Sequence, residues 1–364
     1  MIVDDSAVVR GLVSRWISEE EDLLVVEKCS NGKIAVDKIA DANPDIVVLD
    51  IEMPVMDGLE ALPELQKRAP RSMFLMASTL TQRNAEISLK ALSLGATDYI
   101  AKPEGNRGVT TSEEFRKELV KRIRAIGGKG KRLRAPASPH QGEIQKTKPS
   151  VTLANTGLNA QAPISLKRFS MVRPRVLAIG SSTGGPQALM TLLTNIAPHL
   201  GEIPTIITQH MPPTFTKILA QNLARSLDRT VKEGEHGEIL QPGYIYIAPG
   251  EHHMLVEERE GQVHVVLDGG PQVNYCRPAV DPMTISAAKV FKAGILNIIL
   301  TGMGNDGADG VKAVSSAGGS VIAQDEESSV VWGMPGAAAA TGCCSAVLPL
   351  NEIGPRTASL IRGL

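Results

Sequence analysis

The sequence predicts an α/β protein built from two domains that are joined by a linker. Short apolar runs alternate with helix-like runs twice, first over residues 1–126 and again over residues 173–364. Between them, residues 127–172 contain Pro, Ser, Gln and Lys without a sustained apolar period, a composition typical of a flexible linker. A chain of 364 residues also exceeds the size of one ordinary hydrophobic core, so two domains are expected.

In the first domain, strand-like and helix-like runs alternate strictly. The expected strands are residues 1–3, 24–27, 46–49, 74–77 and 99–101, and the expected helices are residues 7–18, 32–42, 58–68, 83–94 and 113–126. This alternation predicts a parallel sheet that is covered by helices on both faces.

The second domain predicts a doubly wound, mostly parallel sheet. The expected strands are residues 176–179, 205–208, 244–248, 264–267, 296–300 and 321–323, and the expected helices are residues 187–196, 215–226, 282–292 and 309–317. No helix of crossover length separates the strands near residues 244 and 264, so we expect an antiparallel excursion from the sheet there.

Composition disfavours several classes of function. The net charge of −1 gives no general argument for nucleic-acid or membrane binding, and an aromatic content of 3% disfavours a stacking platform for single-stranded nucleic acid. No apolar run reaches the ~20 residues that span a bilayer, and the first residues do not have the pattern of a signal peptide. Cys29, Cys276, Cys343 and Cys344 lack metal-ligand spacing and are expected to be reduced, small apolar residues of a cytoplasmic protein.

Charged and polar side chains follow several strands of the first domain. Asp4 and Asp5 follow the first expected strand and Asp50 the third, and Ser78 and Lys102 follow the fourth and fifth. Parallel strands end at one edge of a sheet, so the carboxylates should converge there and bind a divalent cation such as Mg²⁺. A single aspartate at a strand end more often caps a helix. The whole set, however, is equipped to accept a phosphoryl group on an aspartate.

The same residues resemble a known family. Val3-Asp4-Asp5-Ser6, residues 48–58, Ser78 and Lys102-Pro103 together are similar to a response-regulator receiver domain. The resemblance implies a flavodoxin-like (βα)5 fold, Asp50 as phosphoacceptor, and Asp4, Asp5 and Asp50 as Mg²⁺ ligands. It also implies that Ser78 and Lys102 sense the phosphoryl group, that Tyr99 is a rotating aromatic, and that a chemotaxis histidine kinase is the phosphodonor.

The second domain is organised around the turn Gly180-Ser181-Ser182-Thr183-Gly184-Gly185, between an expected strand and an expected helix. Three interpretations are open: an ordinary capped turn, a phosphate-binding loop, and a nucleophile turn in which Ser182 attacks while N–H groups hold an oxyanion. His210 ends the next strand, where it is either a surface histidine or a general base for Ser182. Asp306 follows the strand at residues 296–300 and could orient that histidine.

The stretch Gly302-Met303-Gly304-Asn305-Asp306-Gly307 supports a competing interpretation. It spells G-x-G-x-x-G between a strand and a helix, and Asp325 and Glu326 follow the next strand near the spacing of a dinucleotide-binding fold. Two details weaken this alternative. The motif comes late in the domain rather than at its first strand, and Asp306 puts a negative charge where a pyrophosphate would bind.

Across residues 176–340 the chain resembles the CheB family of chemotaxis protein-glutamate methylesterases. The resemblance is carried by residues 179–186, 208–213, 246–250, 277–281, 300–307 and 331–335. It implies a catalytic triad of Ser182, His210 and Asp306, in a chain order unlike that of the α/β-hydrolases. It also implies the main chain of Met303 at the oxyanion hole, and it aligns Ser182 rather than the adjacent Ser181 with the nucleophile.

Together the two resemblances imply a phosphorylation-activated serine hydrolase that provides adaptation in bacterial chemotaxis. Its substrates would be γ-glutamyl methyl esters on methyl-accepting chemoreceptors, with glutamine deamidation as a second activity and no cofactor in the catalytic domain. The alternative is a response regulator whose output domain only binds a partner or DNA, which predicts a basic recognition helix that the sequence lacks. We expect neither nucleic-acid binding nor membrane insertion.

Occlusion is the simplest coupling between the two domains, since both should use the carboxyl edge of their sheets. The unphosphorylated first domain would pack over the Ser182 cleft. Phosphorylation of Asp50 would then change the face that carries Ser78 and Tyr99 and weaken the packing.

Overall fold

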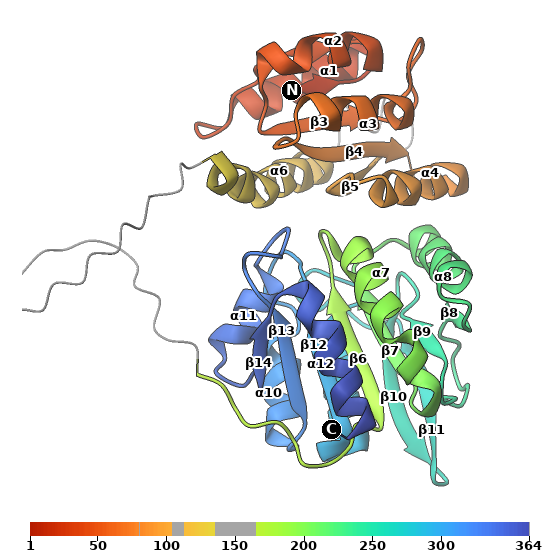
Figure 1. The fold of residues 1–364 in the computed structure, drawn as a ribbon. Coiled ribbons are helices and arrows are strands. Elements are labelled where there is room, and N and C mark those ends of the chain that lie inside the picture. The colour runs from red at the N-terminus through yellow and green to blue at the C-terminus, as the bar shows by residue number, and fades with distance from the viewer. Residues whose placement is uncertain (80, 104–112, 135–164, 364) are drawn as a thin grey trace, which may run out of the picture.

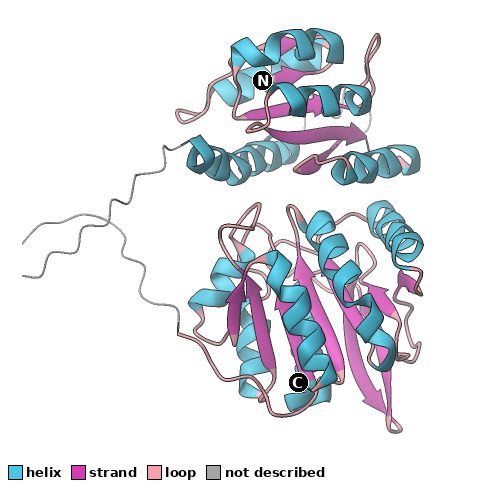
Figure 2. Ribbon diagram, viewed as in Figure 1, coloured by secondary structure: helices cyan, strands magenta, loops and turns pink. Residues whose placement is uncertain are grey.

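The computed structural model describes residues 1–363 apart from residue 80, residues 104–112 and residues 135–164. In Figure 1 and Figure 2 the described chain forms two α/β units, one above the other. The N-terminal unit comprises β1 (Ile2–Val3), α1 (Ala7–Ser18), β2 (Lys28–Cys29), α2 (Gly32–Ala42), β3 (Ile46–Asp50), α3 (Gly58–Arg68), β4 (Met73–Thr79), α4 (Gln82–Ser93), β5 (Asp98–Lys102) and α6 (Glu113–Arg134).

The N-terminal sheet has the strand order β2-β1-β3-β4-β5 and is parallel throughout. Because successive residues of a strand face opposite sides, β3 supplies two cores. Val47 and Leu49 are buried with α2, α3 and α4, whereas Ile46 and Val48 are buried with α1 and α6. The expected parallel sheet with helices on both faces is confirmed.

Two boundaries in this unit differ from the expectation. The second strand was expected at residues 24–27 but lies at Lys28–Cys29, where these two residues pair with Ile2 and Val3 of β1. Helix α6 continues past residue 126 to Arg134, so the first residues of the expected linker are helical. Residues 135–164 of that linker lie outside the described residues.

The C-terminal unit begins with β6 (Val176–Ser181), α7 (Gly185–Ile196), β7 (Thr205–Gln209), α8 (Pro213–Leu227), β8 (Val231–Glu233), β9 (Ile245–Ile247), β10 (His253–Arg259) and β11 (Gln262–Asp268). It continues with α9 (Val280–Phe291), β12 (Ile295–Ile299), α10 (Ala308–Ser316), β13 (Ser320–Gln324), α11 (Met334–Ala340), β14 (Ala346–Leu348) and α12 (Leu350–Arg362). The sheet order is β14-β13-β12-β6-β7-β9-β8, and all of its strand pairs are parallel.

The antiparallel excursion is present, but with a different pairing. Strand β11, expected near residue 264, pairs antiparallel with β10, a strand that the sequence analysis did not predict. Strand β9, near residue 244, instead joins the parallel sheet beside β7 and β8. The β10–β11 hairpin packs with α9 over one face of the sheet, and α7, α8 and α12 cover the other face.

The two units are in direct contact. The side of the N-terminal unit formed by α4, β5 and α6 faces the C-terminal unit (Figure 1), and α4 packs against α7 and α8. The buried cluster formed with α2, α3 and α4 continues into the core of the C-terminal unit around α7 and α8. The carboxyl ends of β6, β7 and β12 point toward this contact.

Candidate functional sites

The predicted acidic residues meet at the carboxyl edge of the N-terminal sheet. Carboxylate oxygens of Asp4, Asp5 and Asp50 lie within 4.8 Å of one another; Asp4 and Asp50 are buried and Asp5 is exposed. The three belong to the ends of two neighbouring strands, β1 and β3, as the parallel order requires. Carboxylate oxygens are the hard ligands that Mg²⁺ prefers, so this donor set fits a magnesium ion.

Lys102 compensates the negative charge at this edge. Its Nζ lies 2.8 Å from Asp4 Oδ2 and 2.7 Å from Asp50 Oδ1. Burial raises the pKa of Asp50 to about 6, although Lys102 opposes the shift. Burial lowers the pKa of Lys102, but the two carboxylates outweigh this and raise it above its usual value. Ser78 lines the same hollow, with its hydroxyl directed to the carbonyl oxygens of Thr79 and Asn84.

In the C-terminal unit, the structure distinguishes the two adjacent serines of the turn after β6. Ser181 is fully buried and its hydroxyl donates to Gln209 Oε1 at 2.7 Å. Ser182 is half-buried and lines a cleft, while its N–H donates to Thr301 O at 3.0 Å. Gly185 begins α7 so close to Gln209 that a Cβ there would lie 2.0 Å from Oε1. Only a glycine therefore fits at this position between the turn and the helix.

His210 and Asp306 are paired at the same cleft. Nε2 of His210 lies 2.7 Å from Asp306 Oδ2, and Val280 N donates to the same oxygen at 2.6 Å. Burial lowers the pKa of His210, but the hydrogen bond with Asp306 outweighs this and raises the pKa above its usual value. Burial raises the pKa of Asp306, yet His210 and the main-chain donors hold it below its usual value. The structure thus brings the three predicted polar residues, Ser182, His210 and Asp306, to one cleft.

The sequence analysis missed two residues beside this pair. Cys276, expected to be an inert apolar residue, has its Sγ 3.5 Å from His210 Nδ1. Asn274 donates from Nδ2 to Asp306 Oδ1 at 3.0 Å. Neither residue belongs to a motif, and each is distant in sequence from its partner. The only available signal was their position directly before residues 277–281, one of the stretches that carried the family resemblance.

The glycine-rich loop after β12 packs against the serine turn. A Cβ on Gly302 would lie 2.9 Å from Ser182 Cβ and 2.4 Å from Met334 Sδ. Met303 lines the cleft together with Ser182. Asp325 is the acidic residue of the dinucleotide alternative. Its carboxylate accepts hydrogen bonds from the N–H and the hydroxyl of Ser328, within the same turn. Asp306 is bound to His210. The geometry of this loop therefore favours the nucleophile interpretation over the dinucleotide one.

The cleft around Ser182 lies between the two units. It has a volume of about 840 Å³, and Tyr99, Lys102, Phe115 and Arg122 of the N-terminal unit line it together with the Ser182 turn. Next to it, the rings of Tyr99 and Phe215 are stacked with centroids 4.3 Å apart and planes 8° apart, a contact typically worth ~0.5–1.5 kcal/mol beyond its area burial.

A polar contact at α7 joins the two units as well. Gln187 Nε2 donates to Leu92 O in the last turn of α4 and, at 3.3 Å, to Ala96 O in the segment that follows this helix. Carbonyl groups at a helix end have no partner within the helix. Leu92 O also accepts from Gly95 N at 3.0 Å, so Gln187 adds a contact between the two units at a helix end.

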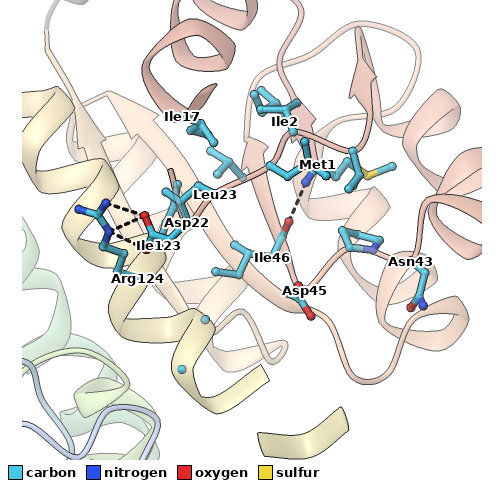
Figure 3. A pocket seen from close by; sticks show the side chains of 17 residues that line it. Met1, Ile2, Ile17, Asp22, Leu23, Asn43, Asp45, Ile46, Ile123 and Arg124 are labelled. Atoms are coloured by element: carbon cyan, nitrogen blue, oxygen red, sulfur yellow. Dashed lines mark hydrogen bonds and ion pairs between the residues drawn. The ribbon is translucent and has the colours of Figure 1, made fainter. Parts of the chain in front are cut away.

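Figure 3 shows a separate hollow of about 450 Å³, which is lined by residues at the beginning of β1 and β3, whereas Asp4 and Asp50 lie at the other end of these strands. Its lining is largely apolar, with Ile2, Ile46 and Ile123 among the side chains. The Met1 amino group donates to Ile46 O at 2.8 Å, and Arg124 is paired with Asp22. Burial lowers the pKa of the Met1 amino group to about 6. We assign no chemistry to this hollow.

Among the described residues, no helix is both long enough and apolar enough to cross a membrane.

Comparison with known proteins identifies relatives of both units. Residues 177–357 match the family described as CheB methylesterase, and residues 1–112 match the response regulator receiver domain. A protein-glutamate methylesterase/protein-glutamine glutaminase of Rhodopseudomonas palustris (strain HaA2) is 52% identical over 364 residues, which cover 100% of this chain and 94% of the relative. A similarly named protein of Rhodospirillum rubrum is 47% identical and covers 97% of this chain and 92% of its own length.

A solved structure is also similar to the C-terminal unit. The CheB methylesterase catalytic domain of Thermotoga maritima is 42% identical, with a TM-score of 0.50. The match covers 52% of this chain and 100% of that domain.

Proposed function

The chain belongs to the CheB methylesterase family, with a receiver domain ahead of the catalytic domain, and we propose that Ser182, His210 and Asp306 perform its chemistry. The protein is a protein-glutamate methylesterase and protein-glutamine glutaminase, a hydrolase of bacterial chemotaxis. The observation that supports the assignment best is the convergence of these three side chains at one cleft, while the neighbouring Ser181 is buried.

The orientation of the imidazole decides which nitrogen acts as the base. Nε2 donates to Asp306, which leaves Nδ1, 3.5 Å from Cys276 Sγ in this structure, as the nitrogen that would accept the Ser182 proton. Ser182 Oγ then attacks the carbonyl carbon of the γ-glutamyl methyl ester. The imidazolium returns the proton to the departing methoxide, and methanol leaves the acyl-enzyme. Water, deprotonated by the same nitrogen, hydrolyses the acyl-enzyme and frees the glutamate side chain.

An oxyanion forms on the substrate carbonyl in both steps and requires fixed donors. We assign this task to the main chain of Met303, which lies in the glycine-rich loop beside Ser182. Attack on the carboxamide of a glutamine follows the same path, with ammonia in place of methanol. No part of either reaction calls for a cofactor in the catalytic domain.

Control of the enzyme begins at the acidic edge of the receiver domain. Asp50 is the proposed phosphoacceptor, a chemotaxis histidine kinase the phosphodonor, and Asp4, Asp5 and Asp50 the residues that would hold Mg²⁺. The ion supplies positive charge that offsets the phosphoryl oxygens. Lys102 already lies between two carboxylates and can turn to a phosphoryl oxygen, while the Ser78 hydroxyl can donate to another.

Occlusion of the catalytic cleft by the receiver domain accounts for the coupling. Tyr99 belongs to β5, the strand that also carries Lys102, and it stacks on Phe215 at the edge of the cleft. A phosphoryl group that moves Lys102, Ser78 and Tyr99 would therefore weaken the contact that covers Ser182. We assign the receiver domain to residues 1–126, the linker to residues 127–172 and the catalytic domain to residues 173–364. The substrates are methyl-accepting chemoreceptors, which the enzyme would reach from the cytoplasm.

The assignment of the nucleophile is tested by paired substitutions of the two serines. Ser182→Ala should lower the release of methanol from methyl-labelled receptor membranes by ~10³-fold or more, as removal of a triad member does elsewhere. Ser181→Ala removes a buried hydroxyl that only contacts Gln209, so its effect on turnover should be small. If Ser181→Ala abolishes activity while Ser182→Ala retains it, the nucleophile has been assigned to the wrong serine.

A further inference from the structure

A tight turn at residues 273–276 lies against the His210–Asp306 pair. Val273 N donates to Cys276 O at 3.1 Å and Cys276 N donates to Val273 O at 2.9 Å. The two residues between them, Asn274 and Tyr275, have φ values of 51° and 63°, the pair of positive values that defines a type I′ turn. This geometry directs the Asn274 amide toward the buried carboxylates and brings Cys276 to His210.

Two buried carboxylates meet beneath this turn. Asp306 is 2% exposed and Asp281, in the first turn of α9, is 4% exposed. The Asp281 carboxylate accepts from Gly310 N at 2.7 Å, and the Asp281 main-chain N–H donates to Asp306 Oδ1 at 3.1 Å. Burial, together with the charge of Asp306, raises the pKa of Asp281. Two like charges in such a site repel each other and require donors between them.

The side chain of Asn274 occupies that position. Its Nδ2 donates to Asp281 Oδ2 at 2.9 Å and to Asp306 Oδ1 at 3.0 Å. Both hydrogens of the amide group are used, one on each carboxylate. The amide is neutral, so it stabilises both carboxylates through hydrogen bonds alone. It does not replace His210 as the charged partner of Asp306.

We propose that Asn274 is a positioning residue of the catalytic site, which fixes the Asp306 carboxylate so that Oδ2 faces His210 Nε2. The proposal rests on the proposed function of Ser182, His210 and Asp306. Without the amide, Oδ1 of Asp306 keeps the Asp281 N–H as its donor, and the neighbouring carboxylate loses its side-chain partner. Asp306 then keeps one main-chain donor on each oxygen, Val280 N on Oδ2 and Asp281 N on Oδ1, and its carboxylate can tilt relative to His210 Nε2. The imidazole is then held less firmly in the orientation that the Asp306 bond gives it.

Two substitutions at this position separate hydrogen bonding from turn formation. Asn274→Gly keeps the positive φ and deletes the amide, whereas Asn274→Asp keeps the shape and replaces the donor by a third carboxylate. The full-length protein and both variants are assayed for methanol release from methyl-labelled receptor membranes, all with a phosphodonor and Mg²⁺ present so that the receiver domain does not cover the cleft. Each is also incubated with a fluorophosphonate probe, which labels an activated serine. Thermal unfolding is recorded for all three proteins.

We expect Asn274→Gly to lower kcat by about 10- to 100-fold, the effect of removing a hydrogen bond to a charged group. KM should change by less than about threefold, because the amide acts through Asp306 and not on the substrate. Labelling of Ser182 should slow in parallel with kcat. Asn274→Asp should be slower than Asn274→Gly, since it adds repulsion. A residue that only shaped the turn would leave both variants close to the unaltered protein in kcat, because glycine and aspartate both suit a type I′ turn.

The possible failures are distinguishable. If the probe does not label Ser182 in the unaltered protein, the proposed catalytic assignment itself is wrong. If Ser182 is labelled but Asn274→Gly reacts and turns over as fast as the unaltered protein, the positioning role of Asn274 is wrong. The same holds if Asn274→Asp is faster than Asn274→Gly.

Discussion

The carboxyl edges of the two sheets both hold buried negative charge, but they stabilise it differently. At the receiver edge a flexible cation, Lys102, contacts Asp4 and Asp50. At the catalytic edge Asp306 is held by His210 and by N–H groups of Val280, Asp281 and Asn274. A lysine side chain can turn to a new anion, whereas main-chain and turn-bound donors cannot move. The receiver edge is thus suited to change between two states, and the catalytic edge to keep one geometry.

The largest expected effect comes from breaking the fixed geometry of the catalytic edge. Asp306→Asn should lower kcat by about 10⁴-fold, as the equivalent change does in other triads, because the amide presents a donor to Nε2 and no longer favours the imidazolium. The measurement is methanol release from labelled receptor membranes. A loss of less than about tenfold would show that Asp306 has no triad function.

The pH dependence of kcat/KM tests the pairing of His210 with Asp306. The pKa of His210 is raised by Asp306, and only the neutral imidazole can accept the Ser182 proton. The value of kcat/KM should therefore rise with pH, and the midpoint of this rise should lie above the ordinary pKa range of histidine. In Asp306→Asn the pKa of His210 falls, so the midpoint for the residual activity should move to lower pH. A midpoint that stays in place would contradict the pairing seen here.

The receiver edge should show a smaller and conditional effect. Asp50→Asn removes the proposed phosphoacceptor and leaves Ser182, His210 and Asp306 untouched, so basal methanol release should be unchanged. A small-molecule phosphodonor with Mg²⁺ should then fail to stimulate the variant, whereas it should stimulate the unaltered protein by roughly 5–150-fold, the range of an allosteric coupling. Stimulation of Asp50→Asn to the level of the unaltered protein would contradict the assignment.

Much of this organisation could be predicted from the sequence because it depends on local patterns. The alternating strands and helices give the two parallel sheets, and the strand ends place Asp4, Asp50 and Lys102 together. Local patterns cannot predict contacts made by irregular segments. The hairpin strand β10 lacked a strong alternating signal and was missed.

The least predictable part of the candidate site is the turn at residues 273–276. Nothing in its composition indicates that Cys276 approaches His210 or that Asn274 bridges Asp281 and Asp306. The contacts with His210 and Asp306 join residues far apart in sequence. They depend on the start of α9 lying against the loop after β12, where Val280 N and Asp281 N donate to Asp306. The position of β2 is a similar case, since Lys28 and Cys29 are the residues that pair with β1.

The smallest expected effect concerns the contact between the domains. Gln187→Ala removes the donor to Leu92 O and Ala96 O. One hydrogen bond of this kind contributes ~0.5–1.5 kcal/mol, so basal activity without phosphodonor should rise by roughly 2- to 10-fold. Thr194→Ala is a matched control, because Thr194 is an exposed residue of the same helix whose hydroxyl bonds within the helix to Met190 O. Equal behaviour of the two variants would mean that Gln187 does not hold the receiver domain in place.

In the proposed mechanism, the receiver domain covers the Ser182 cleft until Asp50 is phosphorylated. This mechanism is tested by comparing the fragment of residues 173–364, which contains the entire seven-stranded sheet, with the full-length protein. Methanol release from methyl-labelled receptor membranes is measured with and without a phosphodonor. The account predicts a fragment that is roughly 5–150-fold faster than the unphosphorylated full-length protein and indifferent to the phosphodonor. A fragment no faster than the unphosphorylated full-length protein would contradict it.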